Sequence, residues 1–218
     1  MPGVSARDAT PPKRRVPTQE RSRRRVEELL DAAARLVVSD GVEAVSTREI
    51  ARAADVPVAS LYQYFADKDA LLLALAGRDM AEMDEQVLAD LAEVKVLTVA
   101  SLVRTTMKAF VTVYHRRRAF VEIYLRGRTN SAVNAFGREH NKRIAETLRA
   151  FAIETGIAAD DLPPKVTLLA VEIGDRVFQL AFEHTPTGEP DLIEEGILLV
   201  TSYVERYATP AGRNGVRL

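Results

Sequence analysis

Hydrophobic residues recur along most of this chain at intervals of three and four positions, the spacing of amphipathic helices. The first such stretch holds Val26, Leu29, Leu30, Ala33, Leu36 and Val37 on one helical face. Gly41 follows at the position of a helix C-cap. The pattern therefore predicts a packing helix that ends near residue 40.

A short second helix is predicted to begin at Ser46. Its hydroxyl can accept from the backbone of Glu49, and the Glu49 carboxylate can return a bond to the backbone of Ser46, which makes a capping box. Ile50, Ala51 and Ala54 share one face and are small enough for another helix to cross closely. We expect this helix to pack against a neighbour through that face.

A tight turn and a third helix are predicted directly afterwards. Asp55 tolerates the left-handed backbone conformation, and Pro57 suits the first turn of a helix because its missing N–H would be unpaired there. Leu61 and Phe65, four residues apart, form the inward face of this helix. Two short helices joined by a tight turn are typical of a helix-turn-helix that reads DNA.

The same segment carries the pattern T-R-E-I-A-x-x-A-x-V-x-x-x-S-L-Y-x-Y-F-x-D-K-x-x-L-L. It resembles the DNA-binding domain of the TetR family of bacterial transcriptional regulators, and the resemblance runs from about Arg21 to Leu75. Two positions depart from the family pattern, since Asp55 replaces the usual turn glycine and Pro57 the usual Ser or Thr. Both residues suit their expected backbone geometry, so the departures bear on base preference and not on the fold.

The residues themselves suggest how this segment would contact DNA. Tyrosine phenols can donate to phosphate oxygens, and short side chains let a helix approach base edges. The resemblance implies phosphate contacts from Thr47, Tyr62 and Lys68 and base contacts from Arg48 and residues 58–60. The predicted DNA interface comprises Thr47, Arg48, Pro57, Val58, Ala59, Ser60, Tyr62, Tyr64 and Lys68.

The remainder of the chain also has helical periodicity. Helices are predicted at about 68–92, 98–118, 119–126, 131–155, 163–183 and 190–207, and no strand pattern competes with them. The predicted fold is all-α, with a disordered basic tail at 1–19, a helix-turn-helix domain at 20–68 and a helical effector-binding and dimerisation domain at 69–218.

The last two predicted helices have more apolar surface than one protomer needs. In this family such a pair forms a four-helix bundle between two protomers, so the resemblance implies a homodimer. The predicted dimer interface comprises Val166, Leu169, Ile173, Val177, Leu180, Ile197, Val200 and Val204. The alternative for each residue is burial within its own protomer.

Aromatic and long apolar residues in the middle of the chain are candidates for the wall of a ligand pocket. They are Met107, Phe110, Tyr114, Phe120, Tyr124, Phe136 and Phe178, and each could equally be ordinary core. The implied ligand is an unknown small apolar effector. Arg104, Glu122, Arg126 and Glu172 are the polar residues that could orient it, or they lie on a solvated surface.

Composition narrows the class of protein further. The formal net charge is −1, but Lys13, Arg14, Arg15, Arg21, Arg23, Arg24 and Arg25 make the amino end strongly basic. This segment is either a solvated, disordered tail or an arm that neutralises phosphates and becomes ordered on DNA. The chain has no cysteine, no apolar run long enough for a membrane span and no close pair of histidines. These features predict a cytoplasmic protein without a bound metal or cofactor.

The sequence therefore predicts a DNA-binding transcriptional regulator, a repressor that a small molecule releases from a palindromic operator. Phosphate-binding loops, dinucleotide fingerprints and the nucleophile motif G-x-S-x-G are missing, which argues against an enzyme. The alternative is a DNA-binding scaffold that docks a partner protein. An internal cavity of several hundred Å³ would favour the ligand sensor, and a filled core with an exposed apolar patch would favour the scaffold.

Overall fold

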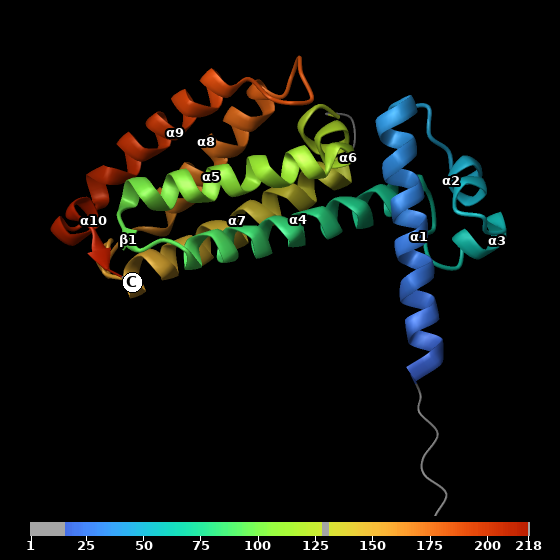
Figure 1. The fold of residues 1–218 in the computed structure, drawn as a ribbon, viewed down its shortest axis with the longest axis horizontal. Helices are drawn as coiled ribbons and strands as arrows, with labels where there is room; N and C mark the ends of the chain where they lie inside the picture. Colours follow the sequence, from blue (N-terminus) through green and yellow to red (C-terminus); the bar gives the residue numbers. More distant parts are fainter. Residues whose placement is uncertain (1–15, 128–130, 218) are drawn as a thin grey trace, which may run out of the picture.

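The computed structural model describes residues 16–127 and 131–217, which form one elongated helical molecule (Figure 1). The long helix α1 (Val16–Asp40) and two short helices lie at one end. A bundle of longer helices extends away from them. The all-α prediction is confirmed. Most of the predicted tail at 1–19 lies outside the described residues, although α1 begins at Val16, within the range predicted as tail.

The helix-turn-helix consists of α2 (Thr47–Ala53), which packs on α1, and α3 (Val58–Leu61), which packs on α2. The Ser46 hydroxyl accepts from the Glu49 backbone, and the Glu49 carboxylate accepts from Ser46 N at 2.9 Å, so the predicted capping box is present. Asp55 adopts a φ of 53°, the left-handed conformation that the turn requires. Leu61 and Phe65 are buried as predicted.

Helix α4 (Lys68–Ala92) joins this unit to the rest of the molecule, and it begins at the predicted residue because Asp67 accepts from Ala70 N at 2.8 Å. It contacts α1 at its start and runs along α5 (Val99–Arg116) and α7 (Ser131–Glu154) farther on. Leu71, Leu72 and Leu75 are buried in the shared core. One continuous helix therefore belongs to both halves of the molecule.

The bundle is completed by α8 (Pro164–Ala181) and α9 (Pro190–Val204), which pack against each other. Helix α7 also packs on α8, and α5 packs on α9. Figure 1 shows α9 and α4 at opposite sides of the bundle. A 3-10 turn, η2 (Glu205–Tyr207), and the short helix α10 (Pro210–Asn214) follow α9.

The segment after α5 is less regular than predicted. The expected helix at 119–126 is divided into a single turn, α6 (Arg118–Phe120), and a π-helical turn, η1 (Val121–Leu125). A two-residue ribbon, β1 (Val96–Leu97) paired antiparallel with β2 (Val216–Arg217), was not predicted. Two residues per strand are too few to produce an alternating pattern, so the sequence carries no strand signal there.

Among residues 16–127 and 131–217, no helix is both long enough and apolar enough to cross a membrane. The same residues contain no group of three or more His, Cys, Asp or Glu that could hold a metal ion.

Candidate DNA interface and internal cavity

Helices α2 and α3 present their outer side chains to solvent at the end of the molecule away from the bundle (Figure 1). Arg48, Pro57 and Ala59 are exposed, and Tyr62 retains 52% of its accessible surface. Thr47, Val58, Ser60, Tyr64 and Lys68 are partly buried. None of the nine predicted DNA-contacting residues is closed off in the core, so the interface stays a coherent proposal.

Two predicted phosphate-binding residues hold each other in place. The Tyr62 hydroxyl lies 3.1 Å from Oγ1 of Thr47, which connects the end of α3 to the first turn of α2. Arg48 follows Thr47 on α2 and extends into solvent. The hydrogen bond therefore fixes the relative orientation of the two helices that would meet the DNA.

Lys68 is less free than the sequence suggested. Its Nζ donates to the carbonyl oxygen of Val42 at 3.1 Å and so ties the loop after α1 to the start of α4. A lysine ammonium has three donors, so this bond leaves others for a phosphate. The structure thus gives Lys68 a structural contact in addition to its proposed one.

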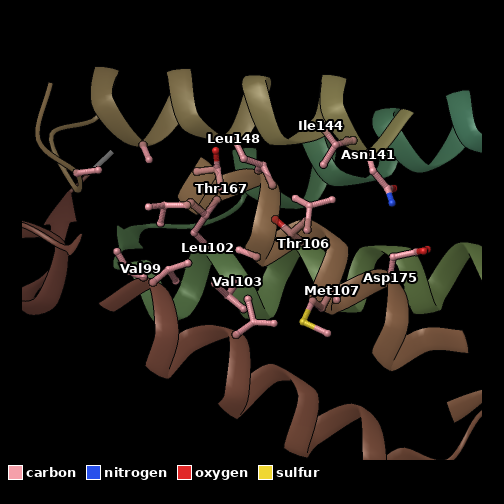
Figure 2. A pocket seen from close by; sticks show the side chains of 18 of the residues that line it. Val99, Leu102, Val103, Thr106, Met107, Asn141, Ile144, Leu148, Thr167 and Asp175 are labelled. Carbon is pink, nitrogen blue, oxygen red and sulfur yellow. The ribbon is translucent and has the colours of Figure 1, made fainter. Parts of the chain in front are cut away.

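A second feature is an internal cavity of about 110 Å³ between α5, α7, α8 and α9 (Figure 2). Most of its wall is aliphatic, including Val99, Leu102, Ile144, Leu148 and Leu162. The cavity is smaller than the several hundred Å³ expected for a ligand sensor. It is nevertheless larger than one water molecule requires.

The predicted pocket residues fall into two groups. Met107, Phe110 and Phe178 do line the cavity, whereas Tyr114, Phe120, Tyr124 and Phe136 do not. Tyr114 stacks on Phe120 with ring centroids 5.8 Å apart and meets Phe178 edge to face. The structure therefore corrects the prediction for these four residues, which belong to the core beside the cavity. Helical spacing does not separate the wall of a cavity from the core that supports it.

The cavity wall contains polar residues that were not predicted, among them Thr106, Asn141, Thr167 and Asp175. Figure 2 shows Asn141 and Asp175 at one end and Thr106 farther inside. Asp175 Oδ2 accepts from the Tyr124 hydroxyl at 3.2 Å and from Gln179 at 2.8 Å. Burial outweighs these bonds and raises the pKa of Asp175 to about 6. No pattern in the sequence indicates that these residues face a cavity, because isolated polar residues on a helix usually face solvent.

The predicted dimer interface needs correction. Val166, Val177, Ile197 and Val200 are buried within the protomer and belong to its core, and Val166, Val200 and Val204 lie against the cavity. Ile173 and Val204 are partly buried, and only Leu169 and Leu180 are exposed, at 47% and 37%. The physical reason is that α8 packs tightly on α9 within one protomer, so most of the apolar residues predicted to contact a partner are buried there instead.

Other leucines remain on the outer surface of this helix pair. Leu198 and Leu199 of α9 retain 59% and 55% of their accessible surface. Neither leucine belongs to the predicted dimer interface, although both lie between its members Ile197 and Val200. With Leu169 and Leu180 they are the large apolar side chains that α8 and α9 leave exposed, and they are the candidates for a surface that another molecule covers.

The polar residues considered as ligand-orienting groups lie elsewhere. Arg104 donates to Glu194 at 2.8 Å on the surface between α5 and α9, and Arg126 pairs with Glu122 within η1. Glu172 accepts a long hydrogen bond of 3.5 Å from Asn141 beside the cavity. None of the four lines the cavity.

A charged cluster joins α1 to the bundle, and sequence reasoning missed it. Arg78 of α4 donates to Glu27 at 3.1 Å and to Asp31 at 2.7 Å, both on α1. It also contacts Asp79, which is 1% exposed and lies 3.7 Å from Arg117 at the end of α5. Burial raises the pKa of Asp79 to about 6 despite both guanidinium groups.

Comparison with known proteins identifies the class to which this fold and site belong. Residues 29–75 match the family model of bacterial regulatory proteins of the tetR family. A TetR-family transcriptional regulator from Streptomyces coelicolor is 31% identical, with a TM-score of 0.69 over 84% of this chain and 99% of that one. The chain belongs to the TetR family of transcriptional regulators, which are not enzymes.

Two further relatives have more specific names. The HTH-type transcriptional repressor KstR of Mycolicibacterium smegmatis is 40% identical over 65 residues, or 30% of this chain and 32% of that protein. The matched segment thus spans about a third of that repressor. FadR of Bacillus subtilis, solved in complex with stearoyl-CoA, shares the fold at 16% identity, with a TM-score of 0.65 over 81% of this chain and 98% of that one.

Proposed function

We propose that this protein is a homodimeric transcriptional repressor that binds a palindromic operator and is released from it by a small apolar effector. The observation that carries the proposal is the exposed outer face of α2 and α3, on which Arg48, Ala59 and Tyr62 lie together without a protein partner among the described residues other than Thr47. The likeness to KstR repressors over the DNA-binding third supports the direction of regulation.

In this proposal α3 lies in the major groove. Val58, Ala59 and Ser60 are short enough to bring the helix backbone close to base edges, and Arg48 reaches a guanine from the neighbouring helix. Thr47, Tyr62 and Lys68 contact phosphates and set the register. One short helix offers few base contacts, so two heads spaced by about 34–36 Å read the two halves of a palindrome.

The second protomer is proposed to dock on the outer surface of α8 and α9. Leu169, Leu180, Leu198 and Leu199 are the exposed leucines of these helices. Leu169 and Leu180 remain from the seam first assigned, and Leu198 and Leu199 take the place of its buried residues. Figure 1 shows α2 and α3 on the side of α1 that faces away from the bundle containing α8 and α9. A dimer formed there would leave both reading heads free.

Release requires an effector that prefers a conformation with wrongly spaced heads. The cavity is the proposed effector site because its aliphatic wall is built from the helices that also form the proposed dimer surface. FadR, which has this fold, binds stearoyl-CoA, and this supports a ligand in the same kind of domain. Coupling of about 1–3 kcal/mol between the sites is typical of such linkage.

The proposal is tested by selecting operator DNA from a random library and then measuring affinity with and without candidate effectors. We expect a palindromic consensus that wild type binds and that Arg48→Ala binds more weakly, with Arg35→Ala as a control at an exposed position on α1. A consensus with no symmetry would contradict the homodimeric repressor. Operator affinity that responds only to a partner protein would favour the scaffold instead.

A further inference from the structure

The cavity contains one polar atom that the fold leaves unsatisfied. Thr106 is 8% exposed, and its Oγ1 has no hydrogen-bond partner among the described residues. Figure 2 shows its side chain entering the cavity from α5. A buried hydroxyl without a partner is rare in folded proteins, because it forfeits its hydrogen bonds to water and gains none in return.

Thr167, on the opposite side of the same cavity, behaves in the usual way. Its Oγ1 donates to the carbonyl oxygen of Pro164 at 3.1 Å, so that hydroxyl is satisfied within its own helix. Of the two threonine hydroxyls in the cavity wall, only that of the more deeply buried Thr106 is left without a hydrogen-bond partner and so remains available to a molecule inside the cavity.

The charges around the cavity disfavour a second class of ligand, the anions. No Lys, Arg or His occurs among the described residues that line it, and the single ionisable acid is Asp175 at one end. An anion placed in this cavity would lose its hydration, find no cation and face the Asp175 carboxylate. The wall thus disfavours a carboxylate or phosphate inside the cavity.

We infer that the cavity binds a neutral, aliphatic molecule with one hydrogen-bond acceptor, a ketone, ester or alcohol, whose oxygen accepts from the Thr106 hydroxyl. This inference rests on the proposed effector site and adds the chemical class of the effector. A pure hydrocarbon would leave the Thr106 hydroxyl without a hydrogen bond, and a carboxylate would have no cation to balance its charge. A neutral molecule with an acceptor oxygen avoids both of these costs.

Four probes of one chain length separate these classes: hexan-2-one, hexan-1-ol, hexanoate and n-hexane. Short probes are used because the cavity, at about 110 Å³, is smaller than the roughly 150 Å³ cavity that accommodates benzene. Calorimetric titration at pH 7.5 should show the ketone and the alcohol binding roughly 2- to 12-fold more tightly than n-hexane, the range expected for one hydrogen bond. Hexanoate should bind least.

Two matched variants assign the effect to one atom. Thr106→Val should reduce the preference for ketone over hydrocarbon to about one without weakening n-hexane, and should raise the melting temperature of the free protein. Thr167→Val makes the same chemical change in the same cavity and should leave the preference intact. Tighter binding of hexanoate, a preference that survives Thr106→Val, or no binding by any probe would each overturn the inference.

The same probes keep this inference apart from the function proposed above. Selectivity is measured without DNA, whereas effector action is measured as a change in operator affinity. If hexan-2-one binds through Thr106 but leaves operator affinity unchanged, the ligand class holds and effector release is wrong. If hexanoate binds best and releases the operator, effector release holds and the ligand class is wrong.

Discussion

Arg78 Nη1 lies 2.7 Å from Asp31 Oδ1, and this pair fastens α4 of the bundle to α1 of the DNA-binding end. The same guanidinium reaches Asp79, which is almost completely buried. Any movement of the bundle that repositions α4 must carry α1 with it or break this cluster. Arg78 therefore adds charged contacts to the packing of α1 on α4, α6 and η1 that holds the two ends of the molecule in one orientation.

We expect Arg78→Ala to lower the free energy of unfolding by about 2–3 kcal/mol, because the buried Asp79 keeps only the more distant Arg117 as a cation. Operator affinity should also fall as the orientation of α1 loosens. Asp31→Asn is the matched control. Asp31 is 56% exposed, so its pair with Arg78 should contribute only about 0.2–1 kcal/mol. Urea unfolding measures the free energy of unfolding of both variants. An equal decrease in the two variants would contradict the role assigned to Asp79.

The DNA-binding end was largely predictable because its signals are local. Ser46 and Glu49 cap α2 through atoms three residues apart, and Asp55 takes the left-handed turn through its own backbone. Such features depend on a few consecutive residues and are visible in a sequence. The contact of Lys68 with Val42 spans 26 residues, and no local pattern announces it.

The bundle was predictable as helices but not as a set of surfaces. Val177 and Leu180 occupy the same apolar helix, yet Val177 is buried against α9 and Leu180 remains exposed. Which side of an apolar helix faces its own chain depends on the arrangement of all its neighbours. Thr106 was missed for the same reason, since an isolated hydroxyl in a helix has no signal until the cavity beside it is known.

The proposed DNA interface on α2 and α3 predicts different effects for substitutions at two of its residues. Arg48→Ala should cost about 1–3 kcal/mol of operator affinity and relax base preference at one symmetric pair of positions, because it removes a base contact. Tyr62→Phe should weaken operator and unrelated DNA alike, because phosphate contacts carry no sequence information. Selection from random DNA with each variant distinguishes the two. An unchanged consensus for Arg48→Ala would make this residue a phosphate contact.

Gly196 sets the distance between α8 and α9. A Cβ at this position would lie only 2.3 Å from Cγ1 of Val177, so Gly196→Ala should separate the helices and lower the free energy of unfolding by about 1–3 kcal/mol. Gly174→Ala is the matched control, because its Cβ would meet nothing nearer than Met107 Cε at 4.0 Å. The control should be neutral or slightly stabilising in a helix interior. Equal melting temperatures would contradict the close packing.

Asp175 should make stability depend on pH in the acid range. Its pKa is raised from 3.8 to about 6 by burial, so the folded state binds more protons than the unfolded state between these values. Stability therefore falls as pH rises from about 4 to 6. Asp175→Asn should remove the Asp175 share of this dependence, up to about 3 kcal/mol gained at pH 7 relative to pH 4, and leave the share of Asp79, whose pKa is also raised to about 6. Unfolding curves at several pH values test this, and a variant with the wild-type slope would refute it.

The outer leucines of α8 and α9 provide the test of the dimer. Leu198→Glu and Leu180→Glu should yield folded monomers, because each places a charge in the proposed seam without burying it in the protomer. Val177→Glu should instead unfold the chain, since Val177 is 7% exposed. Leu88→Glu is the matched control: Leu88 is 62% exposed on α4, on the opposite side of the bundle (Figure 1).

Sedimentation at micromolar concentration measures the result, and circular dichroism confirms that each variant is folded. The monomers should lose most operator affinity although their reading heads are intact, because a single head makes half of the base contacts. The Leu88 variant should remain a dimer and bind its operator as wild type does. Should Leu198→Glu and Leu180→Glu both sediment as operator-binding dimers, the two protomers meet through a different surface.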